Sequence, residues 1–425
     1  MTTILEVNDA ELTLFRGREI QLRSPGIAVL LEDTTYFGEA ALRLSRTHPR
    51  QTNAQYFTRL SADALPFATR QVRNHADLVY LHLRELAPMF DGEILLAVPA
   101  LLTAEQLGVL LGILQELDIR VRGFVDTAVA AAASGVIDDT AVNGSVCHID
   151  VAMQRAVVTN LTIDQEVRRT GCQEVTECGL ARLLESWVNV AADRFIQETR
   201  YDPLHAAASE QQLFDQLCDW IEADPQPAER ALEIAHGDQT RRVDLSRSLL
   251  EQKAALRFQH LLEAVPEQVP MILSARAARL PGIRRFLSAQ RELLAVLPDQ
   301  APAEGCLANL TEIVRSDSDL RLVTRLPRGV AGAVPAAAAA AAPPAGAAPP
   351  AQPPQPTHAL LGSRAISLRS EFLPIPVRFG SDAPLLLADD GLTLNGTGLS
   401  QDTPLKSGDR VGRGADEYII IHVEH

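Results

Sequence analysis

Residues Glu93–Gly135 read EILLAVPALLTAEQLGVLLGILQELDIRVRGFVDTAVAAAASG, and this stretch decides the fold. The short apolar run Ile94–Val98 stops at a proline and predicts a buried strand, whereas Thr103–Leu117 has the length and apolar content of a helix. A second strand is predicted at Ile119–Phe124, and Asp126 begins an alanine-rich helix that runs to the final glycine. Strand, helix, strand and helix in this order form a βαβα unit, whose parallel strands require a sheet covered on both faces.

The composition is that of a globular protein with an excess of acidic residues. Of the 425 residues, 46% are hydrophobic, and the net charge is −15, so we expect neither nucleic acid nor an anionic membrane as a partner. The five cysteines are scattered without a CxxC pair, which favours reduced, buried thiols. We find neither a signal peptide nor an apolar run of the roughly 20 residues that a transmembrane helix needs, which predicts a cytoplasmic protein.

The elements around the central stretch occur in the same order twice. An antiparallel β-meander is predicted before it and a second meander after it, and each is followed by helices and further strands. This repetition predicts an internal duplication at the level of topology. The predicted meander strands are Ile4–Val7, Leu12–Phe15, Ile20–Arg23 and Gly26–Leu31 in the first half, and Ser145–Val151, Arg155–Thr162 and Gln165–Thr170 in the second.

Four segments resemble the actin and heat-shock protein 70 (DnaK-type) ATPase superfamily. Phe37–Arg43, followed by His48–Asn53, is similar to the family's V-G-E-A-A-K…N-P-x-N-T segment. Ile94–Ala100 is similar to its V-I-T-V-P-A strand, and Asp126–Gly135 to its E-P-T-A-A-A-L-A-Y-G helix. Ile272–Gly282 resembles its V-L-V-G-G-S-S-R-M-P-G segment, and the four matches come in the family's order.

The resemblance implies a bilobed α/β domain over residues 1–325 with the duplicated actin-like (ribonuclease H-like) ATPase fold. Its halves would be residues 1–140 and 141–325. Members of the family bind ATP with Mg²⁺ between the halves, so the resemblance also implies ATP/Mg as a cofactor. The segment between Gly38 and Val98 is shorter than in DnaK-type chaperones, which implies a reduced outer part of the first half.

The phosphate-binding loops depart from the family pattern. Where the family has D-L-G-T-T-N-S, Glu6–Leu12 has no glycine and carries Asp9 and Glu11. Where it has D-L-G-G-G-T-F-D, His148–Arg155 lacks all three glycines and the threonine, and the later Gly-Gly pair is Ser274-Ala275. Glycine lets backbone N–H groups approach a phosphate, whereas a carboxylate in contact with a triphosphate costs on the order of 1 kcal/mol even in water.

The lysine that chaperones of this family use is also missing. Thr58 stands at its position in the N-T-x-x-x-I-K-R-L segment, and no lysine precedes Lys253. Arg59 follows and could supply a charge, but a guanidinium is bulkier and cannot donate a proton. Because phosphoryl transfer depends on positioning and charge compensation, we assign no catalytic residue and expect ATP to bind weakly or not at all.

The two altered loops supply most of the candidate site residues. Asp9 and Glu11, with Asp150, would suit a cation, or they are exposed carboxylates on a turn, and the metal is unknown. His148 and Asp150 share one face of a strand, where they either ligate a metal, line a remodelled cleft or form a polar network that Arg155 joins.

The other candidates lie outside these loops. Asp126 matches a family glutamate near the hinge of the cleft, or it is a helix N-cap. Arg276 and Arg279 either pair with the acidic residues or face solvent. The full set of candidate binding residues is Asn8, Asp9, Glu11, Asp126, His148, Asp150, Ser274 and Arg276.

The composition changes after the family-like part. Residues 326–357 consist mainly of alanine, proline and glycine, cannot bury a core and predict a disordered, extended linker. Residues 358–425 read as short strands separated by turns and predict a small β-sandwich or barrel. Within it, L-x-L-N-G…L-x-x-G-D-x-V-G-x-G resembles the end of a forkhead-associated-like domain.

A fold retained without its catalytic groups indicates a role through protein surfaces. The expected function is a non-catalytic or weakly nucleotide-binding, heat-shock-70-like scaffold or chaperone-type assembly factor, which contacts a protein client or a component of a larger machinery. One alternative is an active ATP-dependent, chaperone-like ATPase with unusual phosphate loops. Another is an actin-like adaptor of a membrane-associated machinery.

Overall fold

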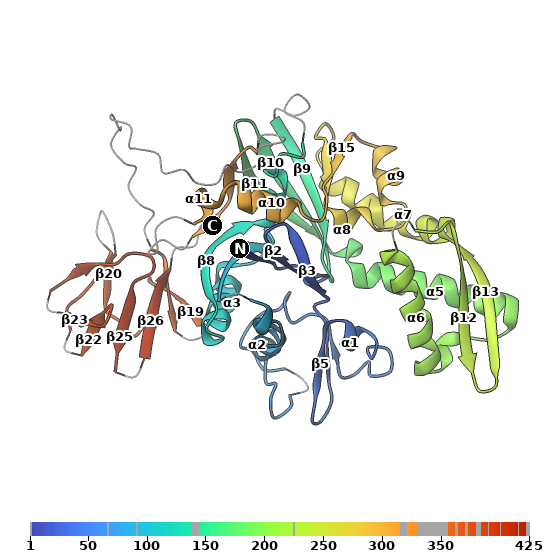
Figure 1. The fold of residues 1–425 in the computed structure, drawn as a ribbon, viewed down its shortest axis with the longest axis horizontal. Helices are drawn as coiled ribbons and strands as arrows, with labels where there is room; N and C mark the ends of the chain where they lie inside the picture. The colour runs from blue at the N-terminus through green and yellow to red at the C-terminus, as the bar shows by residue number, and fades with distance from the viewer. Residues whose placement is uncertain are drawn as a thin grey trace.

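The computed structural model of the chain is a mixed α/β protein with several sheets (Figure 1), so the predicted α/β class is confirmed. None of its described helices is long and apolar enough to cross a membrane. The structure describes residues 2–65, 68–90, 92–137, 144–223, 226–314, 321–329, 356–361, 364–369, 373–379, 384–389, 391–399, 401–414 and 416–421.

The central stretch forms the parallel part of the first six-stranded sheet. Its strands β7 and β8 lie parallel to β1, while β2 and β3 continue the sheet antiparallel on the far side of β1. The strands β1, β2 and β7 are almost entirely buried, as their apolar runs predict for a sheet covered on both faces. In order across the sheet, the strands are β16 (Leu322–Val323), β8 (Arg120–Asp126), β7 (Glu93–Val98), β1 (Thr3–Glu6), β2 (Leu12–Arg16) and β3 (Glu19–Ser24).

The second six-stranded sheet repeats this plan. β9, β10 and β11 form an antiparallel meander, and β14 and β15 add parallel strands beside β9. The predicted meander strands of this half are confirmed, whereas β15, β16 and β17 were not predicted. In the first half, the predicted strand Gly26–Leu31 forms β4 (Ala28–Leu30), which belongs to a separate three-stranded sheet and does not continue the meander. In order, the strands are β15 (Leu293–Val296), β14 (Met271–Leu273), β9 (Gly144–Val151), β10 (Ala156–Ile163), β11 (Glu166–Val175) and β17 (Arg325–Pro327).

Two helices rich in small residues lie between the sheets. The helices α4 (Thr127–Ala132) and α10 (Ala301–Ala308) share one buried core cluster with residues of both sheets. They approach so closely that a Cβ on Gly305 would lie 1.8 Å from the carbonyl oxygen of Ala130. The alanine-rich run is therefore the inner layer of the molecule, since larger side chains would hold the two sheets apart.

The outer surface of the first sheet is covered by α2 (His75–Leu86) and α3 (Ala104–Glu116), whose apolar residues share a core with β1, β2 and β7. Thr103 and Gln106 form a capping box at the start of α3, as the sequence predicts for Thr103. The remaining elements of this half are β4 (Ala28–Leu30), β5 (Thr35–Phe37), α1 (Gly38–Leu42), β6 (Thr52–Asn53) and the 3-10 turn η1 (Ala87–Met89).

A larger outer part belongs to the second half, on the right of Figure 1. Its two-stranded sheet of β12 (Glu229–His236) and β13 (Gln239–Ser246) packs on α5 (Leu180–Thr199) and α6 (Ala207–Glu222). The side-chain amides of Gln212 and Gln216 bond the backbone of Ala235 and Glu233 and thereby close the outer edge of β12. The other elements are η2 (Thr176–Cys178), η3 (Pro203–His205), α7 (Arg247–Ala264), α8 (Ala275–Ala278), α9 (Ile283–Ser288) and α11 (Leu310–Ile313).

The described residues from 356 onward contain strands and no helix. Leu360 of this part packs into the same core cluster as α3. Of the predicted linker, 330–355 lies outside the described residues, and residues 326 and 327 belong to β17 (Arg325–Pro327), which pairs with β11. The strands are β18 (His358–Leu361), β19 (Arg364–Ser367), β20 (Val377–Phe379), β21 (Pro384–Leu386), β22 (Leu392–Leu394), β23 (Thr397–Gly398), β24 (Thr403–Pro404), β25 (Arg410–Arg413) and β26 (Asp416–Ile421).

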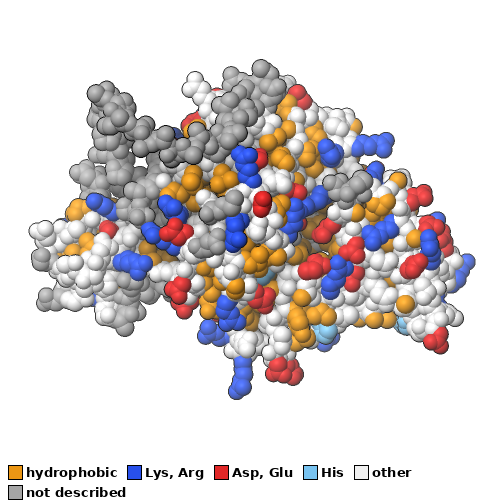
Figure 2. Space-filling model, in the orientation of Figure 1, with side chains coloured by type: hydrophobic (Ala, Val, Ile, Leu, Met, Phe, Trp, Pro, Cys, Tyr) orange, Lys and Arg blue, Asp and Glu red, His pale blue; other side chains and the backbone are white. Residues whose placement is uncertain are grey.

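Acidic and basic side chains are mixed with hydrophobic ones over the face shown in Figure 2. Many of them form ion pairs between elements, such as Arg43 with Asp219 and Arg46 with Glu185. Exposed pairs of this kind contribute less than about 1 kcal/mol each, so the buried ion pairs described next are of more interest.

Candidate functional site

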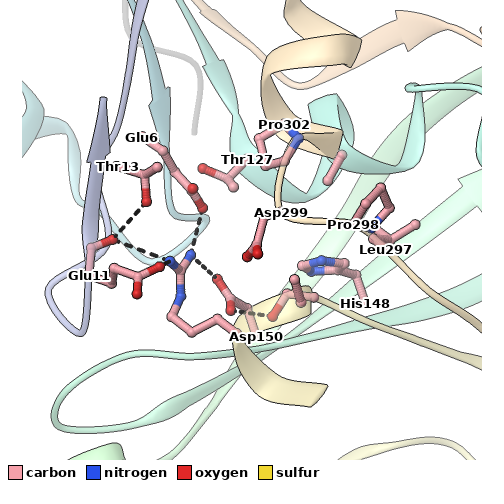
Figure 3. A pocket seen from close by; sticks show the side chains of 14 residues that line it. Glu6, Glu11, Thr13, Thr127, His148, Asp150, Leu297, Pro298, Asp299 and Pro302 are labelled. Atoms are coloured by element: carbon pink, nitrogen blue, oxygen red, sulfur yellow. Dashed lines mark hydrogen bonds and ion pairs between the residues drawn. The ribbon is translucent and has the colours of Figure 1, made fainter. Parts of the chain in front are cut away.

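The candidate site lies where the β1–β2 turn faces the β9–β10 turn and the start of α8 (Figure 3). These are the two altered loops and the segment that carries Ser274 and Arg276. The structure therefore brings together residues that are up to about 270 positions apart in the chain.

The guanidinium of Arg276 is the centre of this site. Its Nη2 lies 2.6 Å from Glu6 Oε1 and 3.3 Å from Asp150 Oδ2, and its Nη1 lies 3.6 Å from Glu11 Oε1. The Arg276 side chain is only 10% exposed. Burial alone would lower the pKa of Arg276, but Asp150, Glu6 and Glu11 outweigh it and raise that pKa above its usual value.

The same neighbours act on the carboxylates. Burial works to raise the pKa of Asp150, but Arg276, His148 and the hydroxyl of Ser274 outweigh it, so this pKa lies below its usual value. Burial raises the pKa of Glu6, although Arg276 opposes it. Asp150 is therefore the more firmly ionised partner of the guanidinium.

Two further arginines extend the ion-pair network toward the surface. Arg279 Nη2 lies 2.9 Å from Glu11 Oε1, and Arg23 Nη1 lies 3.2 Å from the same atom. Asp299 pairs with Arg23 at 2.8 Å and with Arg279 at 3.6 Å. We call Arg276, Arg279, Arg23 and their acidic partners Glu6, Glu11, Asp150 and Asp299 the interlobe ion cluster.

Two backbone N–H groups of the first loop bond to atoms of the loop itself. Asn8 Oδ1 accepts the N–H of Ala10, and the N–H of Glu11 donates to the backbone oxygen of Asn8. The amide nitrogen of Asn8 donates to Asp150 Oδ2 at 2.9 Å and so ties this loop to the second one.

The N–H groups of the second loop bind carboxylates of the protein. The N–H of Met153 donates to Asp9 Oδ1 at 2.6 Å, and the N–H of Val151 donates to Asp150 Oδ1 at 2.8 Å. Asp9 also accepts a hydrogen bond from the hydroxyl of Thr58, the residue that the resemblance places at the position of a lysine. The groups that an anion-binding loop presents to a phosphate therefore hold Asp9 and Asp150 instead.

These residues do not fit a nucleotide with its metal. Pockets for small molecules usually measure about 300–1,000 Å³. The cavity among Glu6, His148, Asp150 and Arg276 measures about 20 Å³, and the mainly apolar cavity on the other side of Arg276 measures about 60 Å³. Of the acids expected to hold a cation, Glu11 and Asp150 pair with the guanidinium of Arg276, whereas Asp9 bonds Thr58 and the N–H of Met153. No group of three or more His, Cys, Asp or Glu within the described ranges could hold a metal.

Asp126 lies apart from the cluster, at the end of β8 and directly before α4. It is fully buried, accepts the N–H of Val129 at 3.1 Å and pairs with Arg169 of β11 at 2.8 Å. Burial raises the pKa of Asp126, and Arg169 opposes this. Asp126 is thus both the N-cap of α4 and an ionic link between the two sheets.

Three of the sequence interpretations are wrong. Not all five thiols are buried, because Cys172 is exposed. Asp9 is not an exposed carboxylate on a turn, because it is 7% exposed and bonded to the second loop. Arg155 does not join His148 and Asp150, because its side chain points to β11 and pairs with Glu174 at 2.8 Å. Ser274 caps α8 and donates to Asp150, and His148 lines the small cavity.

The sequence reasoning missed Glu6, Arg23, Thr127, Arg169 and Asp299. A signal existed for Glu6, because a charged residue inside the apolar strand β1 needs a buried partner. Asp299 carried no signal, since it lies in the connection between β15 and α10, and neither element was predicted. The other three are ordinary polar residues on strands or at a helix start.

Neither a search of protein-family models nor a search of curated proteins finds a match to the chain.

Proposed function

We propose that residues 1–325 have the duplicated, bilobed fold of the actin and heat-shock-70 ATPase superfamily. The proposal is supported by two six-stranded sheets that each join an antiparallel meander to parallel strands. It is also supported by the helix pair α4 and α10, which lies between those sheets. The segment 326–357 acts as a linker in this proposal, and residues 358–425 form an all-β domain.

The protein acts, in this proposal, as a non-catalytic scaffold or assembly factor that does not depend on ATP. The observation that carries this is the position of Arg276, whose guanidinium lies among Glu6, Asp150 and Glu11 where the two loops meet. Carboxylates bound to backbone N–H groups take the place of phosphates, and the guanidinium takes the place of a cation. Contacts inside the chain thus do what a bound nucleotide does in an active member of the family: they hold the two lobes together.

A protein partner suits this arrangement better than a small molecule. The two cavities beside Arg276 are too small for a drug-sized ligand, whereas the chain offers a large outer surface and a second folded part. The linker would let the β-domain reach a second protein while the bilobed part holds the first.

Calorimetric titration of the full chain with MgATP tests the central claim. We expect no saturable heat up to millimolar nucleotide and no rise in the melting temperature. A ligand at 100 times its Kd would stabilise the fold by about 2.7 kcal/mol, which is easily detected. Micromolar binding with phosphate release would refute the proposal and favour the active-ATPase alternative.

Cross-linking of the full chain in its native cells tests the scaffold role. We expect the same protein partners with and without added MgATP, because the proposed lobe arrangement does not change with nucleotide. Partners that are released by ATP would contradict the proposal. Recovery of one membrane protein through its cytoplasmic tail would instead support the adaptor alternative.

A further inference from the structure

A small polar cavity lies beside the interlobe ion cluster, and Arg276 with its carboxylate partners forms part of its lining (Figure 3). Thr127 reaches it from the start of α4, His148 from β9, and Asp299 from the connection before α10. Elements of both halves of the molecule therefore border the cavity.

Two buried polar side chains border this cavity without a hydrogen-bond partner among the described residues. The atoms without a partner are His148 Nε2 and Thr127 Oγ1. His148 is 2% exposed and Thr127 is 7% exposed. Buried nitrogen and oxygen atoms in folded proteins almost always bond either the protein or an ordered water. A hydroxyl and an imidazole nitrogen can each donate or accept, so both can bond the same small molecule.

The size and charge of the cavity restrict what can bind there. A water needs at least about 10–15 Å³ of such space, so the cavity of about 20 Å³ has room for a water but not for a drug-sized ligand. An anion is disfavoured because Glu6 and Asp299 line the cavity. A metal ion is disfavoured because no set of three suitable ligands occurs in the described parts of the chain.

We infer that this cavity is a binding site for one water molecule, which bonds His148 Nε2 and Thr127 Oγ1 and so links β9 of the second sheet to α4 of the first half. The inference rests on these side chains and on the cavity alone, and it holds whether or not the chain is a scaffold. The two sheets would then be joined by uncharged hydrogen bonds through a water as well as by ion pairs.

A crystal structure of the full chain tests the inference directly. We expect one density peak within hydrogen-bond distance of both His148 Nε2 and Thr127 Oγ1. A cavity without density would overturn the inference. So would an anomalous signal at this position in crystals soaked in rubidium or bromide, which would identify a monovalent cation or an anion instead.

A pair of isosteric substitutions gives an independent test in solution. Thr3 and Thr127 are both buried, and the hydroxyl of each has no partner among the described residues, but only Thr127 lines this cavity. Thr127→Val removes a ligand of the water, so its urea midpoint should fall, whereas Thr3→Val should leave the midpoint unchanged or raise it. Equal shifts in the two variants, or a higher midpoint for Thr127→Val, would overturn the inference.

Discussion

Arg276 neutralises several buried acids at once, which makes it the most sensitive single residue of the candidate site. Replacing it by methionine leaves Glu6 and Asp150 buried without their cation. Loss of one partner from a buried ion pair typically costs about 3–5 kcal/mol, so we predict that the free energy of unfolding of Arg276→Met falls by about that amount. Urea denaturation at pH 7 measures it.

Arg155 provides a matched control on the neighbouring hairpin. Its pair with Glu174 is partly exposed, with side chains that are 21% and 48% accessible. Arg155→Met should therefore change the free energy of unfolding by less than about 1 kcal/mol. Similar losses for the two variants would contradict the special role of the buried cluster.

His82 makes stability depend on pH in an outer part of the first half. Its Nε2 lies 2.8 Å from the hydroxyl of Ser24, and its Nδ1 lies 2.8 Å from the hydroxyl of Tyr56. Burial lowers the pKa of His82 from 6.5 to about 4. Between these values the unfolded chain binds a proton that the folded chain does not. We predict that this residue lowers the free energy of unfolding as pH falls from 6.5 to 4, by about 3 kcal/mol in total.

The variant His82→Gln isolates this contribution. Its amide can still donate and accept, but it does not titrate. At pH 7 the variant should be less stable than the wild type, and its stability should depend less steeply on pH between 6.5 and 4. The difference between the urea midpoints of the two proteins at each pH cancels the effects of other titrating groups. Parallel curves of midpoint against pH would refute the prediction.

At the scale of single residues, the sequence predicted the members of the site better than their contacts. Asn8 and Asp150 could be selected because they stand where the resemblance places glycines of phosphate-binding loops, and Asp9 because it is an acid where the resemblance places a threonine. That Arg276 would enter among them could not be predicted. Whether a charge points inward depends on the packing of segments that are far apart in sequence, and both interpretations of Arg276 agreed with the local pattern.

At the scale of elements, the contact of α4 with α10 reverses the usual preference for alanine over glycine. In a helix interior, alanine is normally favoured over glycine by roughly 0.5–1 kcal/mol. A Cβ at Gly305 would meet the carbonyl oxygen of Ala130 at 1.8 Å. We predict that Gly305→Ala is destabilising by about 1–3 kcal/mol or more, as expected for overpacking.

Thermal or urea unfolding of this variant measures the effect, and Gly171→Ala is the matched control. A Cβ at Gly171 would meet only Asn160 Nδ2, at 3.7 Å, which is an ordinary contact. The control should therefore keep the stability of the wild type. An increase in stability for Gly305→Ala would show that the two helices do not approach as described.

Elements with a distinct apolar pattern could be predicted, and elements without one could not. β7, α3 and the meander strands follow from their apolar periodicity and caps. β15 and β16 have four and two residues, and α10 contains glycine and proline, so none has a distinctive pattern. They are ordered by tertiary pairing with β14, β8 and α4, which no local window of the sequence contains.

At the scale of the whole molecule, the two sheets are joined in several independent ways. They share the layer of α4 and α10, the ion pair of Asp126 with Arg169 and the interlobe ion cluster. β16 also returns from the end of the second half to pair with β8 of the first, so the predicted division at residue 140 is not complete. We predict that both halves unfold in one cooperative transition.

The positions of the chromophores allow a simple measurement. Both tryptophans, Trp187 and Trp220, lie in the second half, whereas helical circular dichroism reports on both halves. The two signals should give the same urea midpoint in the wild type. Different midpoints would show that the halves unfold separately.

The closed ion cluster has a consequence for how such a protein would be controlled in a cell. A member of the ATPase family changes shape with each turnover, so its activity depends on the supply and hydrolysis of ATP. In this chain the corresponding charges are covalently part of the polypeptide and are present from the moment of folding. As a scaffold, it would have no cycle to start or stop, and its influence would be set by how many copies are made and how quickly they are degraded.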